Sequence, residues 1–591
     1  MTSKSPRYTL DEGQRFVIDE YNWARSFQNF LPGIAGKWGI PTWCYYVSRH
    51  QGICSMGVND KNHQILEFLS FNKAVAQVGR VGYRTFLRAD GGEVYEPFRK
   101  VRDPRIRQRM IVSSGELEIR EVHEGLGLEI QVVYFALVGT RVPALVRQVR
   151  IRNVGDQARD LELLDGLPHV FPAGVDQEII HVIPRHIEGM IEVAEHRAVP
   201  LMRLKQTPGD VEQVSRIEGG NFYTGFVDGA QVTDLVVDPA VVFGQAENYD
   251  VAWAFEDSPL AQLRARAQIR RNRTPCAFVP HAIRLAPGEE TSICAYLGYV
   301  PRDTDLDPLL DAAADPAFAP AKRGEQARLL GQIKDVCLTV TADPTFDEYC
   351  QQTFLDNVIR GGMPLSFDTA DGPSAFYLYS RQNGDLERDY HYFVVDPTYL
   401  SQGTGHYRSV LQNRRCDTWF FPEIEDFNVR LFTSLTQLDS YSPLEVLQST
   451  YAVKDRDGID VWLAELAPDA DARAALTTAV VGSFAPGEFV MKLEDLGLLG
   501  DRDREALVRD LLGYCSENEV GGRLHLGFWV DHWSYNLDTL EVVLMVYPER
   551  LGELLLERLD YTFFDNPDQV RTREQKHVFH RGRVRQYDAV V

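Results

Sequence analysis

The sequence predicts a multidomain β + α protein, with an N-terminal antiparallel β-sandwich in residues 1–300, a helical linker in residues 301–343 and a helical domain in residues 344–591. Short runs rich in Val, Ile, Tyr and Phe recur between Gly, Pro, Asn and Asp until about residue 300. A segment rich in Asp, Ala and Pro follows, and the pattern beyond it is helical. These observations place the β structure before the helices.

The first part of the chain has the alternation of half-buried strands. In residues 128–134, apolar side chains alternate with Glu129 and Gln131. The run 281–300 is interrupted by Pro and Gly at 286–288, which predicts a hairpin. No long helical pattern separates these strands, so an antiparallel sandwich is favoured over a parallel α/β sheet.

The helical domain is predicted from periodic segments joined by loops. Within the linker, residues 325–336 have helical spacing. Further helices are expected at 347–360, 424–438, 471–481, 503–515, 536–547 and 549–559. This pattern indicates a bundle or an α/α barrel. A hairpin is expected around residues 580–582, followed by an apolar end at 589–591, and we therefore expect the barrel to be incomplete in this chain.

The charge balance argues against two classes of partner. The chain has 62 Lys and Arg against 85 Asp and Glu, a net charge of −23, and a pI of about 5.1. Nucleic acids and anionic membranes attract basic patches, so neither is expected as a partner. A neutral substrate such as a sugar is compatible, whereas an anionic co-substrate requires a local basic cluster.

The eight cysteines are scattered and form no C-x-x-C pair, which is typical of reduced thiols in a cytoplasmic protein and gives no support for a zinc site. The N-terminal residues lack the apolar core of a signal peptide, and no run of about 18 apolar residues occurs. We therefore expect a cytoplasmic protein without a membrane span and without a metal.

Polar and aromatic residues are densest between residues 377 and 426. Such mixtures bind sugars, because aromatic rings cover apolar sugar faces while Asp, Asn, Gln and Arg hydrogen-bond the hydroxyl groups. The candidate substrate-binding residues here are Asp389, Tyr407, Arg408, Gln412 and Asp417. The alternative is a set of solvated loops with incidental ion pairs, but the density of the whole cluster favours a site.

Two adjacent arginines in this stretch, Arg414 and Arg415, are candidates for holding a phosphate group near the sugar, because guanidinium groups bind phosphate oxygens in a bidentate way. Their alternative role is ion pairing with Asp417, Glu423 or Glu425.

A second aromatic cluster spans residues 527–538 at an expected loop-to-helix junction. Trp529 and Trp533 either pack this junction or provide a platform for a sugar ring, and the sequence leaves both readings open. In the second reading, Asp531 lies in the sugar pocket. A third conspicuous run, residues 30–52, is interpreted as packing against the sheet, with Gly and Pro in tight turns.

The sequence lacks the motifs of several other enzyme classes. The segment 403–405 has two glycines but lacks the rest of a dinucleotide fingerprint, and no G-x-x-x-x-G-K-[ST] occurs. Neither G-x-S-x-G nor H-E-x-x-H is present, so esterase and zinc-protease activities are not expected.

Three segments in combination resemble the large β-oligoglucan phosphorylases related to cellobiose phosphorylase, which include glycoside hydrolase families 94, 149 and 161. They are FLPGIAGKWGIPTWCYYVSRHQG at 30–52, DLERDYHYF at 385–393 and GTGHYRSVLQNRRCD at 403–417. The chain resembles the N-terminal portion of that family. The resemblance implies an N-terminal β-sandwich, a helical linker and an (α/α)6-type barrel.

The same resemblance implies an enzyme that cleaves a terminal β-glucosidic bond, β-1,3 in preference to β-1,2, with inorganic phosphate as co-substrate and no cofactor. One carboxylic acid protonates the leaving oxygen and phosphate is the nucleophile, giving α-glucose 1-phosphate with inversion. The family's Y-R-D-x-x-Q segment, which lines the sugar subsite, corresponds to residues 407–412. Tyr407, Arg408 and Gln412 match it, whereas Ser409 replaces the Asp.

The segment that carries the general-acid Asp of the family, similar to W-N-D or Y-D-A-L-N-G, is not found. Asp531 is the candidate for this role in the present chain. Residues 344–591 are too few for six long helix pairs, so the expected enzyme needs a further C-terminal segment or a complementary chain, and a homodimer is a further option. Two alternatives stay open: a non-catalytic carbohydrate-binding relative or fragment, and an inverting hydrolase or transglycosylase on the same scaffold.

Overall fold

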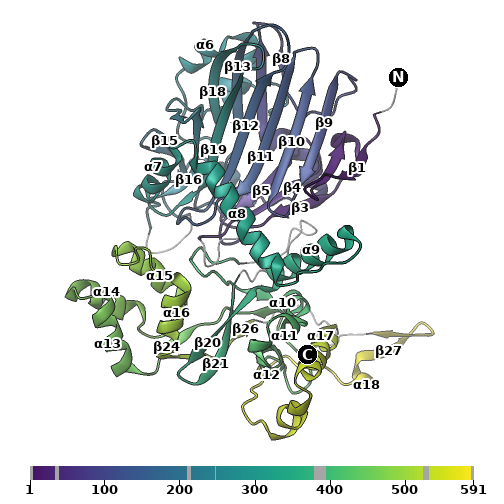
Figure 1. Cartoon of the computed structure of the whole chain (residues 1–591), viewed down its shortest axis with the longest axis vertical. Helices are drawn as coiled ribbons and strands as arrows, with labels where there is room; N and C mark the ends of the chain where they lie inside the picture. The colour runs from purple at the N-terminus through teal and green to yellow at the C-terminus, as the bar shows by residue number, and fades with distance from the viewer. Residues whose placement is uncertain are drawn as a thin grey trace. The chain divides into compact units, whose positions relative to one another are not determined.

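A computed structural model describes residues 4–33, 39–208, 214–246, 248–378, 394–523 and 531–586 (Figure 1). The chain divides into two compact units. Unit 1 comprises Met1–Ile333, Val340–Tyr349 and Gly384–His391, and unit 2 comprises Lys334–Thr339, Cys350–Asn383 and Tyr392–Val591.

Unit 1 is built on an 11-stranded antiparallel sheet. Its strands, in spatial order, are β1 (Arg7–Leu10), β2 (Phe16–Asp19), β9 (Ile106–Val112), β10 (Glu116–His123), β11 (Leu128–Ala136), β12 (Ala144–Asn153), β19 (Glu290–Val300), β16 (Gly220–Val227), β15 (Val199–Leu204) and β14 (Ile191–His196), with β17 (Ala230–Gln231) paired to β16. In β11, Leu128 and Ile130 are buried while Glu129 and Gln131 are half-buried, which confirms the predicted alternation.

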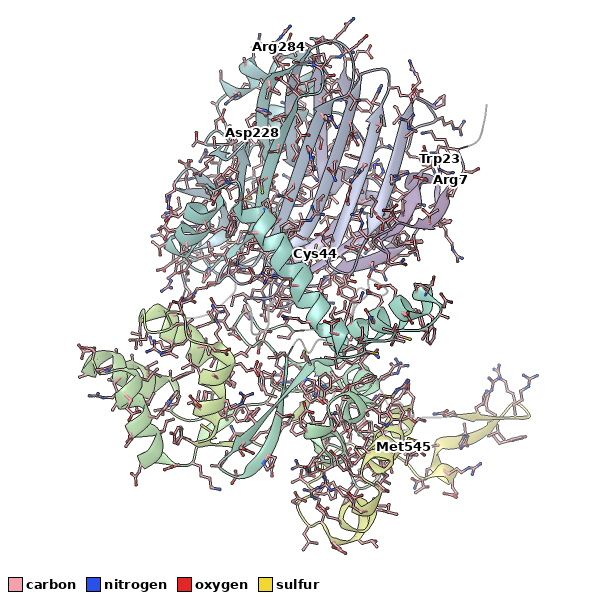
Figure 2. All side chains as sticks on the ribbon, viewed as in Figure 1. Arg7, Trp23, Cys44, Asp228, Arg284 and Met545 are labelled. Atoms are coloured by element: carbon pink, nitrogen blue, oxygen red, sulfur yellow. The ribbon has the colours of Figure 1, made fainter. Side chains whose placement is uncertain are left out.

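Two four-stranded sheets complete the β structure. One contains β18 (Ala277–Leu285), β13 (Arg159–Leu167), β7 (Arg84–Ala89) and β8 (Val94–Tyr95), and the other contains β3 (Gln28–Leu31), β4 (Trp43–Val47), β5 (Ile53–Gly57) and β6 (Gln64–Leu66). One hydrophobic core joins Ile130 of the large sheet to Leu163 of β13 and Met56 of β5. Cys44 of β4, labelled in Figure 2, is fully buried in this core. The described part of the run 30–52 therefore packs in the interior, as its composition predicted.

The expected hairpin at 281–300 is wrong. β18 pairs with β13 in a four-stranded sheet, whereas β19 pairs with β12 and β16 in the large sheet. The turn does form, and Gly288 adopts a φ of +84°, which favours glycine. This turn connects a strand of one sheet to a strand of the other. A Pro-Gly pair occurs in turns within a sheet and in turns between sheets, so the sequence alone does not distinguish the two cases.

Three helical elements cover part of the other face of the large sheet. They are η3 (Asp303–Leu306), α7 (Asp307–Ala313) and α8 (Phe318–Asp335), the last of which crosses the sheet in Figure 1. Leu309 and Leu310 of α7 pack in one cluster with Phe135, Phe226 and Tyr296 of the strands. Helical structure is therefore present in the range where the linker was expected, and its apolar side chains extend the core of unit 1.

Unit 2 combines helices with small sheets. Its main helices are α9 (Pro344–Gly361, whose first six residues count with unit 1), α10 (Tyr407–Arg414), α11 (Asp417–Phe420), α12 (Phe427–Ser434), α13 (Arg456–Leu466), α14 (Ala470–Ala479), α15 (Pro486–Asp495), α16 (Arg504–Leu512) and α17 (Asp531–Val546). Hairpins form from β20 (Met363–Thr369) with β21 (Gly372–Leu378) and from β27 (His577–His580) with β28 (Arg583–Gln586), the second as predicted. The small strands β22 (Gly405–His406), β23 (Glu445–Val446) and β26 (Gly522–Arg523) form one sheet, and β24 (Tyr451–Val453) pairs with β25 (Cys515–Glu517).

Most of the predicted helices are present, with changed bounds. α9, α14 and α16 occupy predicted ranges, α12 is shorter than expected, and α17 begins five residues earlier, at Asp531 instead of Asn536. The helix expected at 549–559 is a short 3-10 turn, Pro548–Arg550, followed by a π turn, Glu553–Glu557. The (α/α)6 arrangement stays a prediction.

The structure also bears on membrane-spanning helices, metal ligands and disulfides. Across the described ranges, no helix combines the length and apolarity needed to cross a bilayer. The same ranges contain no group of three His, Cys, Asp or Glu side chains that could hold a metal ion. None of the eight cysteines, all of which lie in the described ranges, forms a disulfide.

Candidate functional site

The two sequence clusters meet where α10 lies against α17, entirely within unit 2. α10 carries residues 407–414 of the first cluster, and the first two turns of α17 carry residues 531–538 of the second. Met545, labelled in Figure 2, marks the far end of α17. Asp389 and Trp529 lie outside the described residues.

Tyr407 fixes α10 to its neighbours. Its ring is fully buried, and its hydroxyl donates to the Phe432 carbonyl of α12 over 2.8 Å and accepts from Asn536 Nδ2 of α17 over 3.0 Å. Burial raises its pKa to about 12. The Tyr407 hydroxyl group therefore donates one hydrogen bond and accepts another within the protein. These two bonds hold α10 against α12 and α17.

Arg408, the next residue, reaches Asp531 at the start of α17. Arg408 Nε donates to Asp531 Oδ2, and the two side chains are 37% and 34% exposed. This hydrogen bond raises the pKa of Arg408. The second oxygen, Asp531 Oδ1, is buried and has no hydrogen-bond partner in the described part of the chain. Within the described ranges, the carboxylate therefore has one acceptor without a partner, beside a half-exposed guanidinium.

His532, the residue after Asp531, is buried between α17 and α10. Its ring packs on Tyr407 at a centroid distance of 4.6 Å, and Nδ1 lies 2.6 Å from Ser442 Oγ. Burial lowers its pKa to about 4, so the imidazole is neutral at pH 7. Nε2 is buried and finds no partner among the described atoms.

Trp533 and Arg415 lie toward the surface. Trp533 is 40% exposed, and its Nε1 donates to the Ser440 carbonyl over 3.1 Å, which orients the indole. Arg415 Nη1 lies 3.4 Å from Asp538 Oδ2, and its guanidinium lies 5.4 Å from the centre of the Tyr535 ring. The predicted ion pair of Arg415 therefore forms with a different carboxylate from those expected. Gln412 is half-buried one helical turn after Arg408, on the same face of α10.

Arg414 and Asp417 belong to a separate, buried polar cluster. The Arg414 guanidinium lies 3.6 Å from the centre of the Tyr377 ring, and Nε donates to the Gly361 carbonyl. Burial lowers the pKa of Arg414 to about 10 and raises that of Asp417 to about 8. Asn428 Nδ2 donates to Tyr377 Oη over 2.6 Å. In this geometry both predicted site residues are interior groups that support β21, α10 and α11.

Some titratable residues of unit 2 were not singled out by the sequence. Burial and the nearby Glu488 raise the pKa of Asp396 to about 6. Burial also raises the pKa of Glu517, which lines a cavity of about 480 Å³. Neither residue lies in a recognisable motif, so only the tertiary contacts identify them.

The α10–α17 arrangement combines the Arg408 guanidinium as donor, the Asp531 carboxylate as acceptor, and the Trp533 indole at the surface. Such a set binds ligands that carry several hydroxyl groups, because each hydroxyl both donates and accepts.

No protein-family model and no curated protein matches the chain. Solved structures with detectable similarity include a protein described as a kojibiose phosphorylase from the human microbiome, with a TM-score of 0.32 and 9% identity over 73% of this chain and 46% of that one. A bacterial glucoamylase complexed with acarbose has a TM-score of 0.35 and 8% identity over 82% of this chain and 69% of that one. A GH92 α-mannosidase from Bacteroides thetaiotaomicron has a TM-score of 0.20 and 10% identity, covering 77% and 50%. The aligned part is less than half of the first of these proteins.

Proposed function

We propose that the α10–α17 site binds glucosyl units of a β-linked gluco-oligosaccharide, and that the chain is part of an inverting phosphorylase for such substrates. The observation that carries the proposal is the half-exposed Arg408–Asp531 pair, in which Asp531 Oδ1 accepts no hydrogen bond from any described residue. A sugar hydroxyl accepts a hydrogen bond from the guanidinium while it donates to the carboxylate, and charge-assisted bonds of this kind are the strong ones.

Trp533 and Arg415, which lie near the Arg408–Asp531 pair, add a sugar-stacking surface and a phosphate-binding group to the proposed site. Trp533 offers an exposed indole to an apolar sugar face, and its bond to the Ser440 carbonyl limits the reorientation of the ring. Arg415 is the arginine of the pair that is exposed enough to hold phosphate, in exchange for Asp538. The buried Arg414 supports the helix in this scheme.

In the proposed reaction, a phosphate oxygen attacks the anomeric carbon, and the bond from that carbon to the glycosidic oxygen breaks. The leaving oxygen takes a proton from a carboxylic acid, and inversion gives α-glucose 1-phosphate. Asp531 is the acid suggested by the sequence, but its pairing with Arg408 suits a hydrogen-bond acceptor better than a proton donor. We therefore propose that Asp531 orients the sugar and that another carboxyl group supplies the proton.

Arg408→Ala tests the binding site. We expect the affinity for laminaritriose, measured by isothermal titration calorimetry, to fall about tenfold or more, because a hydrogen bond to a charged group contributes about 1.5–3 kcal/mol. Arg284→Ala is the matched control, because it removes an exposed ion pair with Asp160 on a strand of unit 1. Unchanged laminaritriose affinity in Arg408→Ala would contradict the site.

The reaction is tested separately from binding. Phosphate-dependent release of glucose 1-phosphate from laminari- or sophoro-oligosaccharides supports a phosphorylase, and glucose release without phosphate supports a hydrolase. Binding without either product supports a non-catalytic relative or fragment. Asp531→Asn then separates the two roles of this residue: complete loss of turnover with retained binding indicates the acid, whereas weakened binding indicates the sugar contact.

A further inference from the structure

The β27–β28 hairpin of unit 2 is exposed on both of its faces. Every residue of its two strands is exposed in the described structure. Directly opposite residues of an antiparallel pair share a face, so Phe579 and Val584 make one face apolar, whereas Arg583 and Arg585 lie on the other. A two-stranded hairpin without a covering layer is marginally stable at best. This hairpin therefore gains stability from any surface that covers it.

The hairpin belongs to a basic segment of an acidic chain. Residues 571–586 include six Lys and Arg and one Glu, a net charge of +5, whereas the whole chain carries −23. Arg581, Arg583 and Arg585 are exposed and form no ion pair with any described residue. The hairpin thus presents three cations without a counter-charge together with an apolar pair.

Unit 2 also contains an open cavity of about 710 Å³ with the opposite charge, here called the acidic groove. It is lined by residues of β20, the turn η4 (Pro422–Ile424), α13 and the end of α16. Its carboxylates Asp368, Glu423 and Asp510 are exposed and take part in no ion pair within the described part of the chain. Trp462 and Tyr514 line it with half-buried rings whose centres are 6.1 Å apart. Carboxylates and aromatic faces both bind arginine side chains.

Two further charged residues line the acidic groove, and both already have partners. Glu425 pairs with Arg550 over 2.7 Å, and Arg509 pairs with Glu505 over 3.1 Å. Among the described residues, the groove therefore has an excess of three carboxylates, which matches the three arginines of the hairpin in number and is opposite in sign.

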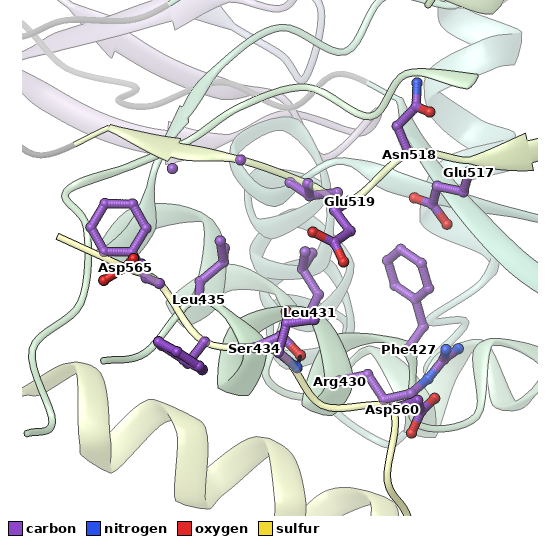
Figure 3. Close-up of a pocket in the computed structure, with 16 residues that line it drawn as sticks. Phe427, Arg430, Leu431, Ser434, Leu435, Glu517, Asn518, Glu519, Asp560 and Asp565 are labelled. Atoms are coloured by element: carbon purple, nitrogen blue, oxygen red, sulfur yellow. Dashed lines mark hydrogen bonds between the residues drawn. The ribbon is translucent and has the colours of Figure 1, made fainter. Parts of the chain in front are cut away.

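The cavity of about 480 Å³ beside α12, shown in Figure 3, is a poorer receptor for cations. Its labelled side chains include the guanidinium of Arg430, which repels a second guanidinium, and its Asp560 already pairs with Arg558 over 2.8 Å. The acidic groove is therefore the better match for the hairpin.

We propose that the acidic groove binds the β27–β28 hairpin of a second copy of this chain, and that the contact is reciprocal, so that two copies form a closed two-fold dimer. The three arginines of the hairpin pair with the three carboxylates of the groove, and Phe579 packs on Trp462. The net charges of the two copies do not prevent this contact, because repulsion between distant charges is screened beyond about 8 Å at physiological ionic strength. A long polyanion such as nucleic acid is disfavoured, because it would extend from the hairpin over a chain of net negative charge.

The test is analytical ultracentrifugation of the full chain at about 0.15 M ionic strength. We expect twice the mass of the 67.1 kDa chain. Reversing the charges of either surface should give the single mass, because like charges then meet at both contacts. The hairpin variant carries Arg581→Glu, Arg583→Glu and Arg585→Glu, and the groove variant carries Asp368→Lys, Glu423→Lys and Asp510→Lys. An equimolar mixture of the two variants should restore the double mass, because each hairpin then meets a groove of opposite charge, which also shows that both variants are folded.

A control variant makes the same change in net charge as the hairpin variant at exposed arginines of unit 1 that form no ion pair with described residues: Arg102→Glu, Arg152→Glu and Arg271→Glu. It should dimerise as the unchanged chain does. A mass other than that of a dimer for the unchanged chain, a dimer that survives either charge reversal, dissociation of the control, or a mixture that remains monomeric would each overturn the proposal. Every readout is a mass, so the outcome does not depend on sugar binding at the α10–α17 site.

Discussion

At the scale of single residues, Arg147 and Asp165 form an ion pair in the core of unit 1 with no exposed side-chain surface. Arg147 Nη2 also donates to Gln51 Oε1 over 2.7 Å, and Thr85 Oγ1 donates to Asp165 Oδ1 over 2.6 Å. The pair is therefore hydrogen-bonded on several sides. Such a cluster compensates for the desolvation of both charges only while every member is present.

Arg147→Met should lower the free energy of unfolding of unit 1 by about 3–5 kcal/mol, because it leaves the Asp165 carboxylate buried without its counter-charge. Urea denaturation followed by circular dichroism measures the loss. The double variant Arg147→Met/Asp165→Leu removes both charges and should recover part of the loss. A single variant as stable as Arg284→Ala, which breaks an exposed pair, would show that the buried pair contributes little.

Adjacent residues of a helix cannot be assigned one role from the sequence. Arg414 and Arg415 were both predicted to hold phosphate, yet successive side chains point about 100° apart around a helix. Arg414 consequently lies against the Tyr377 ring in the interior, and Arg415 lies near the surface with Asp538. The residue types indicated a polar site, but the side of α10 that faces the core depends on contacts with β21, α12 and α17.

At the scale of elements, α17 couples its N-terminal turn to the core through His532. The ring is 1% exposed and its pKa is lowered to about 4, below the ordinary 6.5. Between these values the unfolded chain binds a proton that the folded chain does not bind, so acidification favours unfolding. The contribution of His532 is present in full above pH 6.5 and is lost as the pH falls toward 4.

We therefore expect His532→Gln to flatten the decline in stability between pH 6.5 and 4, by a slope of at most about 1.4 kcal/mol per pH unit for one proton. The measurement is the free energy of unfolding of both proteins across this range. His50 and His169, whose pKa values burial also lowers to about 4, remain in both proteins and cancel in the difference. Parallel pH profiles would show that His532 titrates normally in the folded chain.

The existence of several elements could be predicted from local patterns of apolar and capping residues, although most of their bounds changed. The alternation in 128–134 predicted β11, and Asp503 accepts from the Glu505 and Ala506 amides at the start of α16, which fits the helix predicted from residue 503. The start of α17 was missed, because Asp531-His532-Trp533 has the composition of a loop. Its helical conformation depends on tertiary packing of His532 against Tyr407, which overrides local preference.

At the scale of the whole molecule, the candidate site is a long-range assembly. Arg408 and Asp531 are 123 residues apart, and their two clusters were recognised separately by density of polar and aromatic residues. No sequence signal specified that the two clusters meet, because that contact depends on how α10 and α17 pack. The cavity of about 480 Å³ depends in the same way on three segments that are distant in the sequence, and no motif marks it.

The two units each contain hydrophobic clusters of their own: Ile130 and Leu163 belong to a cluster in unit 1, and Tyr407 and Phe432 belong to one in unit 2. Units with separate cores unfold as separate cooperative transitions unless an extensive interface couples them. Differential scanning calorimetry of the intact chain should therefore resolve two transitions.

Arg147→Met should lower the midpoint of one of these transitions by about 5 °C or more, since each kcal/mol of lost stability shifts the midpoint of a domain of this size by about 2–4 °C. His532→Gln should move the other at pH 5 and leave the first in place. A single transition that both variants shift would show that the chain unfolds as one cooperative body, in which the stability of each unit depends on the other.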